Sequence, residues 1–179
     1  RNTMTPVRSL EDDGTYIATT DAQISLAHAM SLDHLTRAEN TVDAVSTLLG
    51  GHSIDGYAMV NMGAIQIVND MVGGVTVTVE EDFPDSDTLK KGATVTLQGA
   101  DAERYIRERK TVADGLNQNR ISRQTQYEEA FKPAFRAKCS ENTTFPLDVY
   151  HAVEDYMTTN ISAKKFSRLA LLLTDEQAE

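Results

Sequence analysis

The chain has 179 residues, 40% of them hydrophobic, with only 10 glycines and 4 prolines. This is a globular composition, and the length predicts a single domain over residues 1–179. A formal net charge of −10 excludes broad binding to nucleic acids or anionic membranes, both of which require a cationic face.

Two further features bound the class of protein. The single cysteine, Cys139, excludes an intramolecular disulfide, and no apolar run approaches the roughly 18 residues of a membrane helix. The chain begins at Arg1 without an initiator methionine or signal peptide. We therefore expect a piece of a longer protein, whose preceding segment could carry a membrane anchor.

Apolar spacing in the first half predicts helices and a strand in alternation. We predict helices over residues 22–30, 37–49 and 62–72, and a buried strand over residues 57–61. The pairs Gly50-Gly51 and Gly73-Gly74 are helix stops, because glycine adopts the left-handed conformation that follows many helix ends.

The second half contains the clearest strand. Val75 to Glu80 alternates valine and threonine, which predicts one buried and one exposed face, and Thr94 to Leu97 is the expected antiparallel partner. Helices are predicted over residues 99–107, 119–138, 147–157 and 164–173. Strands interleaved with helices predict an α/β layered domain.

The segment from Glu103 to Arg123 reverses the charge of the chain. It holds three carboxylates against six cations, which are Arg104, Arg107, Arg109, Lys110, Arg120 and Arg123. On an exposed helix such cations usually form a solvated face with weak ion pairs. They are also what an anion site requires, because guanidinium groups bind phosphate oxygens bidentately and stay charged.

Helical spacing favours the anion site. One stripe runs from polar and cationic to aromatic side chains, and consists of Asn117, Arg120, Gln124, Tyr127 and Phe131. With Asn117 or Asn119 as the N-cap, Arg120 and Arg123 fall in the first turns, where the helix dipole disfavours cations. A bound phosphate-type anion would compensate both the cations and the free N–H groups.

Four strings in order resemble one family. RNTMT, VNDMVGGVTVTVEEDF, LQGADAERYIRERK and NQNRISRQTQY together, spanning residues 1 to about 131, closely resemble the LytR-CpsA-Psr family of bacterial envelope proteins. The resemblance implies a three-layer α/β/α sandwich with a mixed central sheet, from which the family's N-terminal strands are missing here. It also implies an extracytoplasmic location on the bacterial membrane, through an anchor outside this chain.

The implied activity is transfer of a glycopolymer. Members of the family attach a polyprenyl-pyrophosphate-linked polymer, such as teichoic acid or capsular polysaccharide, to peptidoglycan, usually with Mg²⁺. By position, the resemblance assigns catalysis to Arg1, Arg107, Arg109 and Arg120, and substrate binding to Arg123 and Gln124. Asp70 and Asn117 are expected to be structural or orienting.

Two departures from the family bear on activity. Asn2 stands where the family normally has aspartate, and an amide lacks the charge with which to hold Mg²⁺ or orient an arginine. The family's upstream aspartate motif is not in this chain. Asn2 favours a second hypothesis, a non-catalytic binder of polyprenyl-diphosphate-linked glycans. A third is a pyrophosphatase that acts on the same lipid with water as the nucleophile.

The polyprenyl chain requires an apolar tunnel. The candidates for its lining are Val42, Val45, Leu49, Ile65 and Val68. Side chains with this spacing more often belong to an ordinary core, and periodicity cannot separate the two because it reports burial and not what a side chain is buried against.

Overall fold

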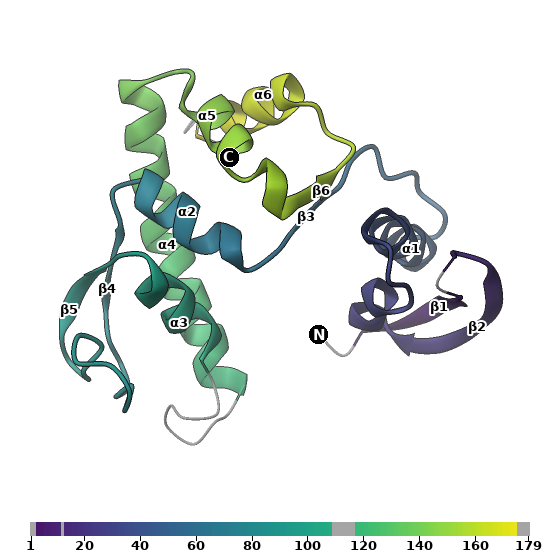
Figure 1. Ribbon diagram of the computed structural model, residues 1–179, viewed down its shortest axis with the longest axis horizontal. Coiled ribbons are helices and arrows are strands. Elements are labelled where there is room, and N and C mark those ends of the chain that lie inside the picture. Colours follow the sequence, from purple (N-terminus) through teal and green to yellow (C-terminus); the bar gives the residue numbers. More distant parts are fainter. Residues whose placement is uncertain (1–2, 12, 109–116, 175–179) are drawn as a thin grey trace. The chain divides into compact units, whose positions relative to one another are not determined.

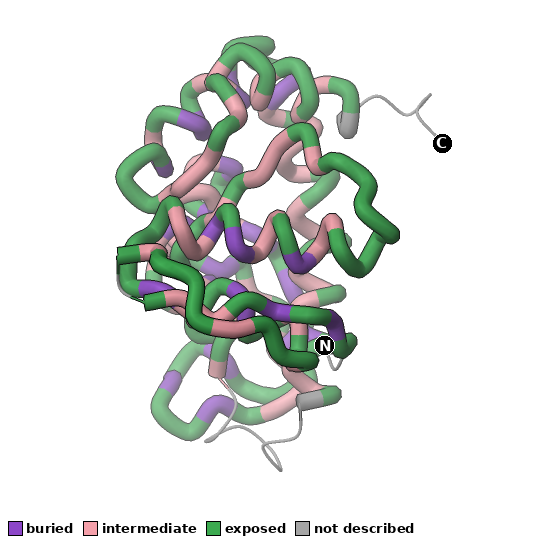
Figure 2. The backbone as a smooth tube through the Cα atoms, turned by 90° about the vertical axis from the view of Figure 1, so that its right-hand side faces the viewer, coloured by how far each residue is buried: buried purple, intermediate pink, exposed green. Residues whose placement is uncertain are grey.

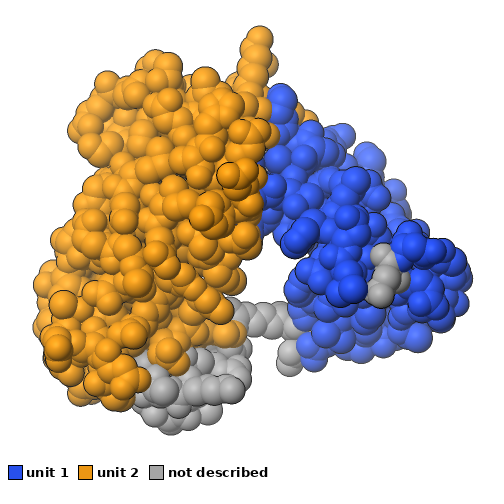
Figure 3. Space-filling model, in the orientation of Figure 1, with its two compact units in different colours: residues 1–60, 157–162 blue, residues 61–156, 163–179 orange. Residues whose placement is uncertain are grey.

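The computed structural model describes residues 3–11, 13–108 and 117–174, which form α-helices, two short 3-10 helices and paired strands (Figure 1). Figure 2 shows buried residues recurring among exposed ones along the helices. The backbone clusters into two compact units, residues 1–60 with 157–162 and residues 61–156 with 163–179 (Figure 3). The single domain expected from length stays a prediction.

The first unit is built on an antiparallel hairpin and one helix. Strand β1 (Met4–Leu10) pairs with β2 (Tyr16–Gln23), and a 3-10 helix, η1 (Ile24–Ala29), leads to helix α1 (His34–Leu48). Its core is small, with Val7, Ala27 and Ala44 at the centre. A short ladder of β3 (Ala58–Val60) with β6 (Met157–Thr159) completes the unit.

Polar side chains set the ends and the packing of α1. Asp33 caps the helix by accepting the Thr36 backbone N–H at 2.8 Å, and this bond together with the Thr36 hydroxyl lowers the pKa of Asp33. From inside the helix, buried Asn40 donates to the backbone oxygens of Arg8 and Ala27 at 2.9 and 2.8 Å. One amide therefore ties α1 to β1 and η1.

The second unit holds the larger core. It contains α2 (Gly63–Met71), the antiparallel pair β4 (Val75–Thr78) and β5 (Thr94–Leu97), and α3 (Ala100–Arg107). The long α4 (Asn117–Glu141) packs against β4 and α3, and is followed by α5 (Phe145–Ala152), η2 (Glu154–Tyr156) and α6 (Ala163–Thr174).

Strand β4 confirms the predicted alternation. Val75 and Val77 are buried, while Thr76 and Thr78 face solvent and their hydroxyls lie 2.9 and 3.4 Å from those of the threonines opposite on β5. Because side chains of a strand alternate between its faces, the valines enter the core beneath α4 and α2.

The aromatic part of the predicted α4 stripe is in the core. Tyr127, Phe131 and Phe135 contact one another at centroid distances of 6.0 and 5.7 Å, and Phe135 continues to Phe145 of α5 at 5.5 Å. Such pairs add to the stabilisation from apolar burial. The stripe thus joins α4 to α5.

Several predicted elements differ from the structure. Residues 22–23 belong to β2 and only 24–29 are helical, as a 3-10 turn. The strand expected to be buried is short and pairs with β6 alone among the described strands, and its Ala58 and Val60 are exposed. The helix expected to reach Met157 ends at Ala152, since Met157 is used in β6.

The α/β class is confirmed. Within the described residues the strands pair two by two, as β1 with β2, β3 with β6 and β4 with β5, all antiparallel, so no single mixed sheet joins them. The hairpin of β1 and β2 was not predicted, because β2 is polar and largely exposed and lacks the apolar alternation that marks a half-buried strand.

Candidate functional site

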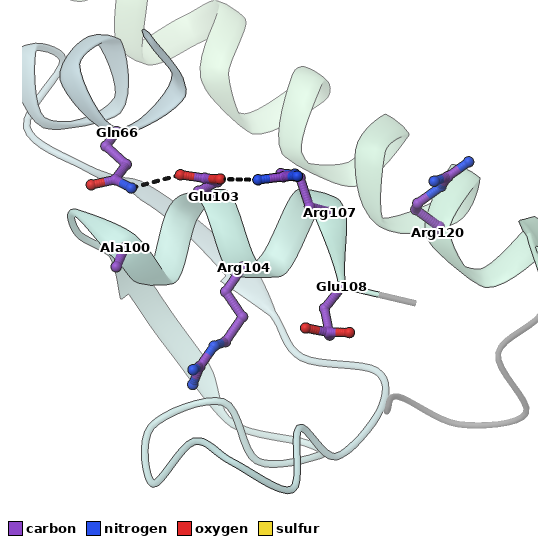
Figure 4. A pocket seen from close by; sticks show the side chains of 7 residues that line it. All are labelled: Gln66, Ala100, Glu103, Arg104, Arg107, Glu108 and Arg120. Atoms are coloured by element: carbon purple, nitrogen blue, oxygen red, sulfur yellow. Dashed lines mark hydrogen bonds and ion pairs between the residues drawn. The ribbon is translucent and has the colours of Figure 1, made fainter. Parts of the chain in front are cut away.

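A cationic pocket of about 620 Å³ lies in the second unit, where α2, α3 and the start of α4 meet (Figure 4). Its lining consists of Gln66, Ala100, Glu103, Arg104, Arg107, Glu108 and Arg120. Three guanidinium groups and two carboxylates thus surround one hollow. Two of the predicted catalytic arginines, Arg107 and Arg120, are brought together there from different helices.

Glu103 joins Arg107 to α2. One of its carboxylate oxygens accepts the Gln66 amide at 2.6 Å and the other pairs with the Arg107 guanidinium. The Gln66 hydrogen bond, followed by that of Arg107, lowers the pKa of Glu103, so the carboxylate is charged at neutral pH. Residues four apart on a helix are neighbours, which is why Arg107 meets Glu103.

The other two arginines of the pocket lie on different helices, Arg104 on α3 and Arg120 on α4. Arg104 donates to the Asp85 backbone oxygen at 2.7 Å, and Figure 4 shows its side chain leaving α3 in a different direction from Arg107. Arg120 lies in the first turn of α4, which begins at Asn117. The positive end of the helix dipole in that turn adds to the positive potential.

Arg123 does not line the pocket. Its side chain is only 2% exposed and pairs with Glu81 at 3.0 Å, donates to the Glu108 backbone oxygen, and lies 5.1 Å from the centre of the Phe83 ring. A guanidinium enclosed in this way is not positioned to touch a ligand. The substrate contact predicted for Arg123 is therefore not seen, because tertiary packing turns this side chain inward.

Gln124 and Tyr105 connect α4 with α3. The Gln124 amide donates to the Ile106 backbone oxygen at 3.3 Å, and the Tyr105 hydroxyl donates to Gln126. Tyr105 is fully buried, and this burial, with the nearby charge of Glu80, raises its pKa to about 12. Gln124 does not line the pocket in this structure, so its predicted role in substrate binding stays a prediction.

Asp70 lies in a hydrogen-bond network at the end of α2. Its carboxylate accepts the Gly99 backbone N–H at 2.8 Å and the Asn69 amide at 2.9 Å. Buried Asn69 also donates to the Leu97 oxygen at 2.8 Å and accepts the Tyr127 hydroxyl at 3.2 Å. These bonds join the end of α2, the β5–α3 turn and α4, which is a structural arrangement.

Several predicted site residues lie outside the described residues. These are Arg1, Asn2 and Arg109, and of Asn117 only the backbone, at the start of α4, is described. Their predicted roles stay predictions.

The predicted tunnel residues do not share one cavity. Val42 and Val45 line an apolar pocket of about 400 Å³ in the first unit, with Ile54, Tyr57 and Met59. Leu49 is half exposed and is not among its lining residues. Ile65 and Val68 pack against the core of the second unit, so they act there as ordinary core residues.

Sequence reasoning missed part of the pocket. Glu103, Arg104 and Glu108 lie in the predicted cationic segment but were not assigned to the site, although the four-residue spacing of Glu103 and Arg107 was a usable signal. Gln66 carried no signal, since an amide on a partly buried helix face is common.

The predicted Mg²⁺ finds no ready ligand set in the part of the chain that is described. No cluster of three or more His, Cys, Asp or Glu side chains occurs among these residues, and both oxygens of Glu103 are already engaged. Mg²⁺ prefers several oxygen ligands in octahedral geometry, which these side chains do not provide. Magnesium use stays a prediction.

The fold and the pocket define a mixed α/β protein in which arginines of two helices line one hollow. The LytR_cpsA_psr family model matches residues 1–179, and the chain belongs to this family. No described helix is both long and apolar enough to span a membrane.

Three comparisons place the chain among its relatives. It is 37% identical over 91 residues to the cell wall biosynthesis protein LcpA of Corynebacterium glutamicum, which is 50% of this chain and 17% of LcpA. The crystal structure of B. subtilis TagU has a TM-score of 0.56 at 26% identity, covering 93% of this chain and 65% of TagU. The structure of TagT bound to LI-WTA has a TM-score of 0.60 at 20% identity, and the match covers 95% of this chain and 60% of TagT. The chain thus spans only part of each of these proteins.

Proposed function

We propose that the chain belongs to a phosphotransferase that attaches a polyprenyl-pyrophosphate-linked glycopolymer to peptidoglycan on the extracytoplasmic face of the bacterial membrane. The polymer would be of the teichoic acid or capsular polysaccharide type. The observation that carries the proposal is the meeting of Arg107 from α3 and Arg120 from α4 at one pocket. The names of LcpA, a cell wall biosynthesis protein, and of TagT bound to LI-WTA support a role in the cell wall.

The proposed reaction is a phosphoryl transfer. A peptidoglycan hydroxyl attacks the phosphorus nearer the glycan, a phosphodiester forms, and polyprenyl phosphate leaves. Catalysis of this kind consists mainly of positioning and of stabilising oxygens that gain negative charge. Guanidinium groups of Arg107 and Arg120 would grip the diphosphate from two sides, with Arg104 contributing positive potential at the rim.

The first unit has an apolar pocket of its own. Its volume of about 400 Å³ and its lining by Val42, Val45 and Ile54 suit part of an isoprenoid chain.

Removal of either arginine tests the grip on the diphosphate. Arg107→Ala and Arg120→Ala are each expected to weaken polyprenyl-diphosphate binding by about 2–4 kcal/mol, because a charged hydrogen bond in a partly desolvated pocket is lost. Isothermal titration calorimetry measures the change. The control is Lys132→Ala, which removes an exposed ion pair with Glu128 on the same helix. Unchanged binding in both arginine variants would refute the pocket as the diphosphate site.

One incubation separates the transferase from its rivals. Purified protein is mixed with lipid-linked glycan, Mg²⁺ and peptidoglycan fragments, and the products are resolved by mass spectrometry. A glycan–peptidoglycan conjugate is expected. Bound but intact lipid would instead indicate a binder, and phosphate products without conjugate would indicate a pyrophosphatase.

A further inference from the structure

We propose that Arg123 is a positioning residue that holds the C-terminal end of α3, and with it Arg107, at a set distance from Arg120 on α4. Arg123 acts through the backbone of Glu108 and through Glu81, and does not touch the ligand. The ligand part of this inference rests on the proposed function, whereas the positioning of α3 does not.

The Arg123 guanidinium contacts two segments of the chain outside α4. Arg123 follows Arg120 by one helical turn, and its partners come from two other segments of the chain. Glu81 and Phe83 lie just after β4, at 3.0 Å and 5.1 Å, and the Glu108 backbone oxygen lies just after the end of α3. One side chain therefore fastens α4 to both segments.

Glu108 is the residue that caps the C-terminal end of α3. Its backbone N–H donates to the Arg104 oxygen at 2.9 Å, which is the hydrogen bond that closes the last turn. The same residue's carbonyl accepts from Arg123. Arg107 belongs to that turn, so movement of Glu108 would carry Arg107 away from the pocket.

Burial of the Arg123–Glu81 ion pair costs free energy. Taking a guanidinium and a carboxylate out of water is offset only when the geometry is good and the other hydrogen-bonding groups are satisfied. Glu81 and the Glu108 carbonyl satisfy two arms of the Arg123 fork, while its Nε has no partner among the described residues. Stability by itself is a weak reason to keep such a pair.

Neighbouring bonds show that this joint is built from several contacts. Gln124 donates to the Ile106 oxygen, and Tyr105 donates to Gln126. Both join α3 to α4 within a turn of Arg123. A pocket whose arginines are fixed before the anion arrives loses less conformational entropy on binding, which favours affinity and catalysis.

Arg123→Lys tests the inference with the least disturbance of charge. Lysine keeps the ion pair with Glu81 but lacks the planar fork that reaches two acceptors at once. Hydrogen exchange of the amides of residues 105–108 is expected to become about tenfold faster, because the last turn of α3 is released. Amides of α5 should be unchanged, which separates local release from general destabilisation. Unchanged exchange at residues 105–108 would overturn the inference.

A double-mutant cycle tests how Arg123 acts on the ligand. Inorganic diphosphate is titrated into the parent, Arg123→Lys, Arg107→Ala and the double variant. Arg123→Lys is expected to weaken binding about fivefold in the parent and not measurably in Arg107→Ala, since its effect passes through Arg107. Equal losses in both backgrounds would show direct contact and overturn the inference.

Two further variants serve as controls for the exchange experiment. Glu81→Gln should reproduce the faster exchange at residues 105–108, because it removes the other anchor of the guanidinium, and Lys132→Ala should leave it unchanged. A parent that fails to bind diphosphate would refute the proposed function, while the exchange experiment would still decide whether Arg123 positions α3.

Discussion

Glu103 places a negative charge among the arginines of the pocket. It is held by Gln66 and paired with Arg107, so an arriving phosphate meets a guanidinium that already has an anionic partner. Like charges repel, and any phosphate near Arg107 must compete with this carboxylate. The pairing also holds Arg107 in place, and the balance of these two effects can be measured.

Glu103→Gln is expected to tighten inorganic diphosphate binding several-fold. Glutamine removes the repelling charge but keeps an oxygen that can accept from Arg107. Titration calorimetry at low and moderate salt measures the change, which should shrink as salt screens the repulsion. The matched control is Glu128→Gln, which neutralises an exposed carboxylate on α4. Weaker binding by Glu103→Gln would mean that the carboxylate serves chiefly to orient Arg107.

At the scale of elements, the turn between α2 and β4 is packed closely against β5. Gly73 and Gly74 both have positive φ, at +93° and +89°. A Cβ on Gly73 would meet nothing within 4 Å, whereas one on Gly74 would lie 2.7 Å from the Leu97 oxygen and also clash with Gln98. The second glycine is required because β5 approaches it closely.

The two glycines therefore make a matched pair. Gly73→Ala should cost about 1 kcal/mol of unfolding free energy, the cost of a left-handed conformation, whereas Gly74→Ala should cost about 2 kcal/mol more, because backbone at β5 must also shift. Urea unfolding followed by circular dichroism measures both. Equal costs for the two substitutions would show that β5 moves aside freely.

At the scale of the whole molecule, a net charge of −10 surrounds a local cationic pocket. The proposed anion site is therefore local, and the rest of the protein lacks the cationic face of a general binder of polyanions. The larger core, in the second unit, includes Tyr105 and has Tyr127 packed against it. These two phenols behind the pocket couple the stability of the unit to alkaline pH.

Stability should fall as pH rises from about 10 to about 12. Burial raises the pKa of both Tyr105 and Tyr127 to about 12, whereas an unfolded tyrosine releases its proton near 10. Between these values the unfolded state binds fewer protons than the folded state, so the unfolding free energy decreases with pH. Urea unfolding across this range, beside tyrosinate absorbance of Tyr105→Phe and Tyr127→Phe, measures it. Stability independent of pH in this window would contradict the burial argument.

Local patterns in the sequence determined much of the second unit. The alternation of β4, its pairing with β5 and the glycine stops all follow from the chemistry of neighbouring residues. The charge reversal picked out six cations, and three of them, Arg104, Arg107 and Arg120, line the pocket. These features depend on local conformation, which a short stretch of chain specifies by itself.

Only the tertiary structure decided what each side chain faces. Arg120 and Arg123 share a helix and a charge, yet one lines the pocket and the other is enclosed by Glu81, Phe83 and Glu108. Val45 lines a pocket while Val68 packs in a core, although both recur at the same helical spacing. The physical reason is that periodicity determines which face of an element a residue occupies, whereas the segment covering that face comes from a distant part of the chain.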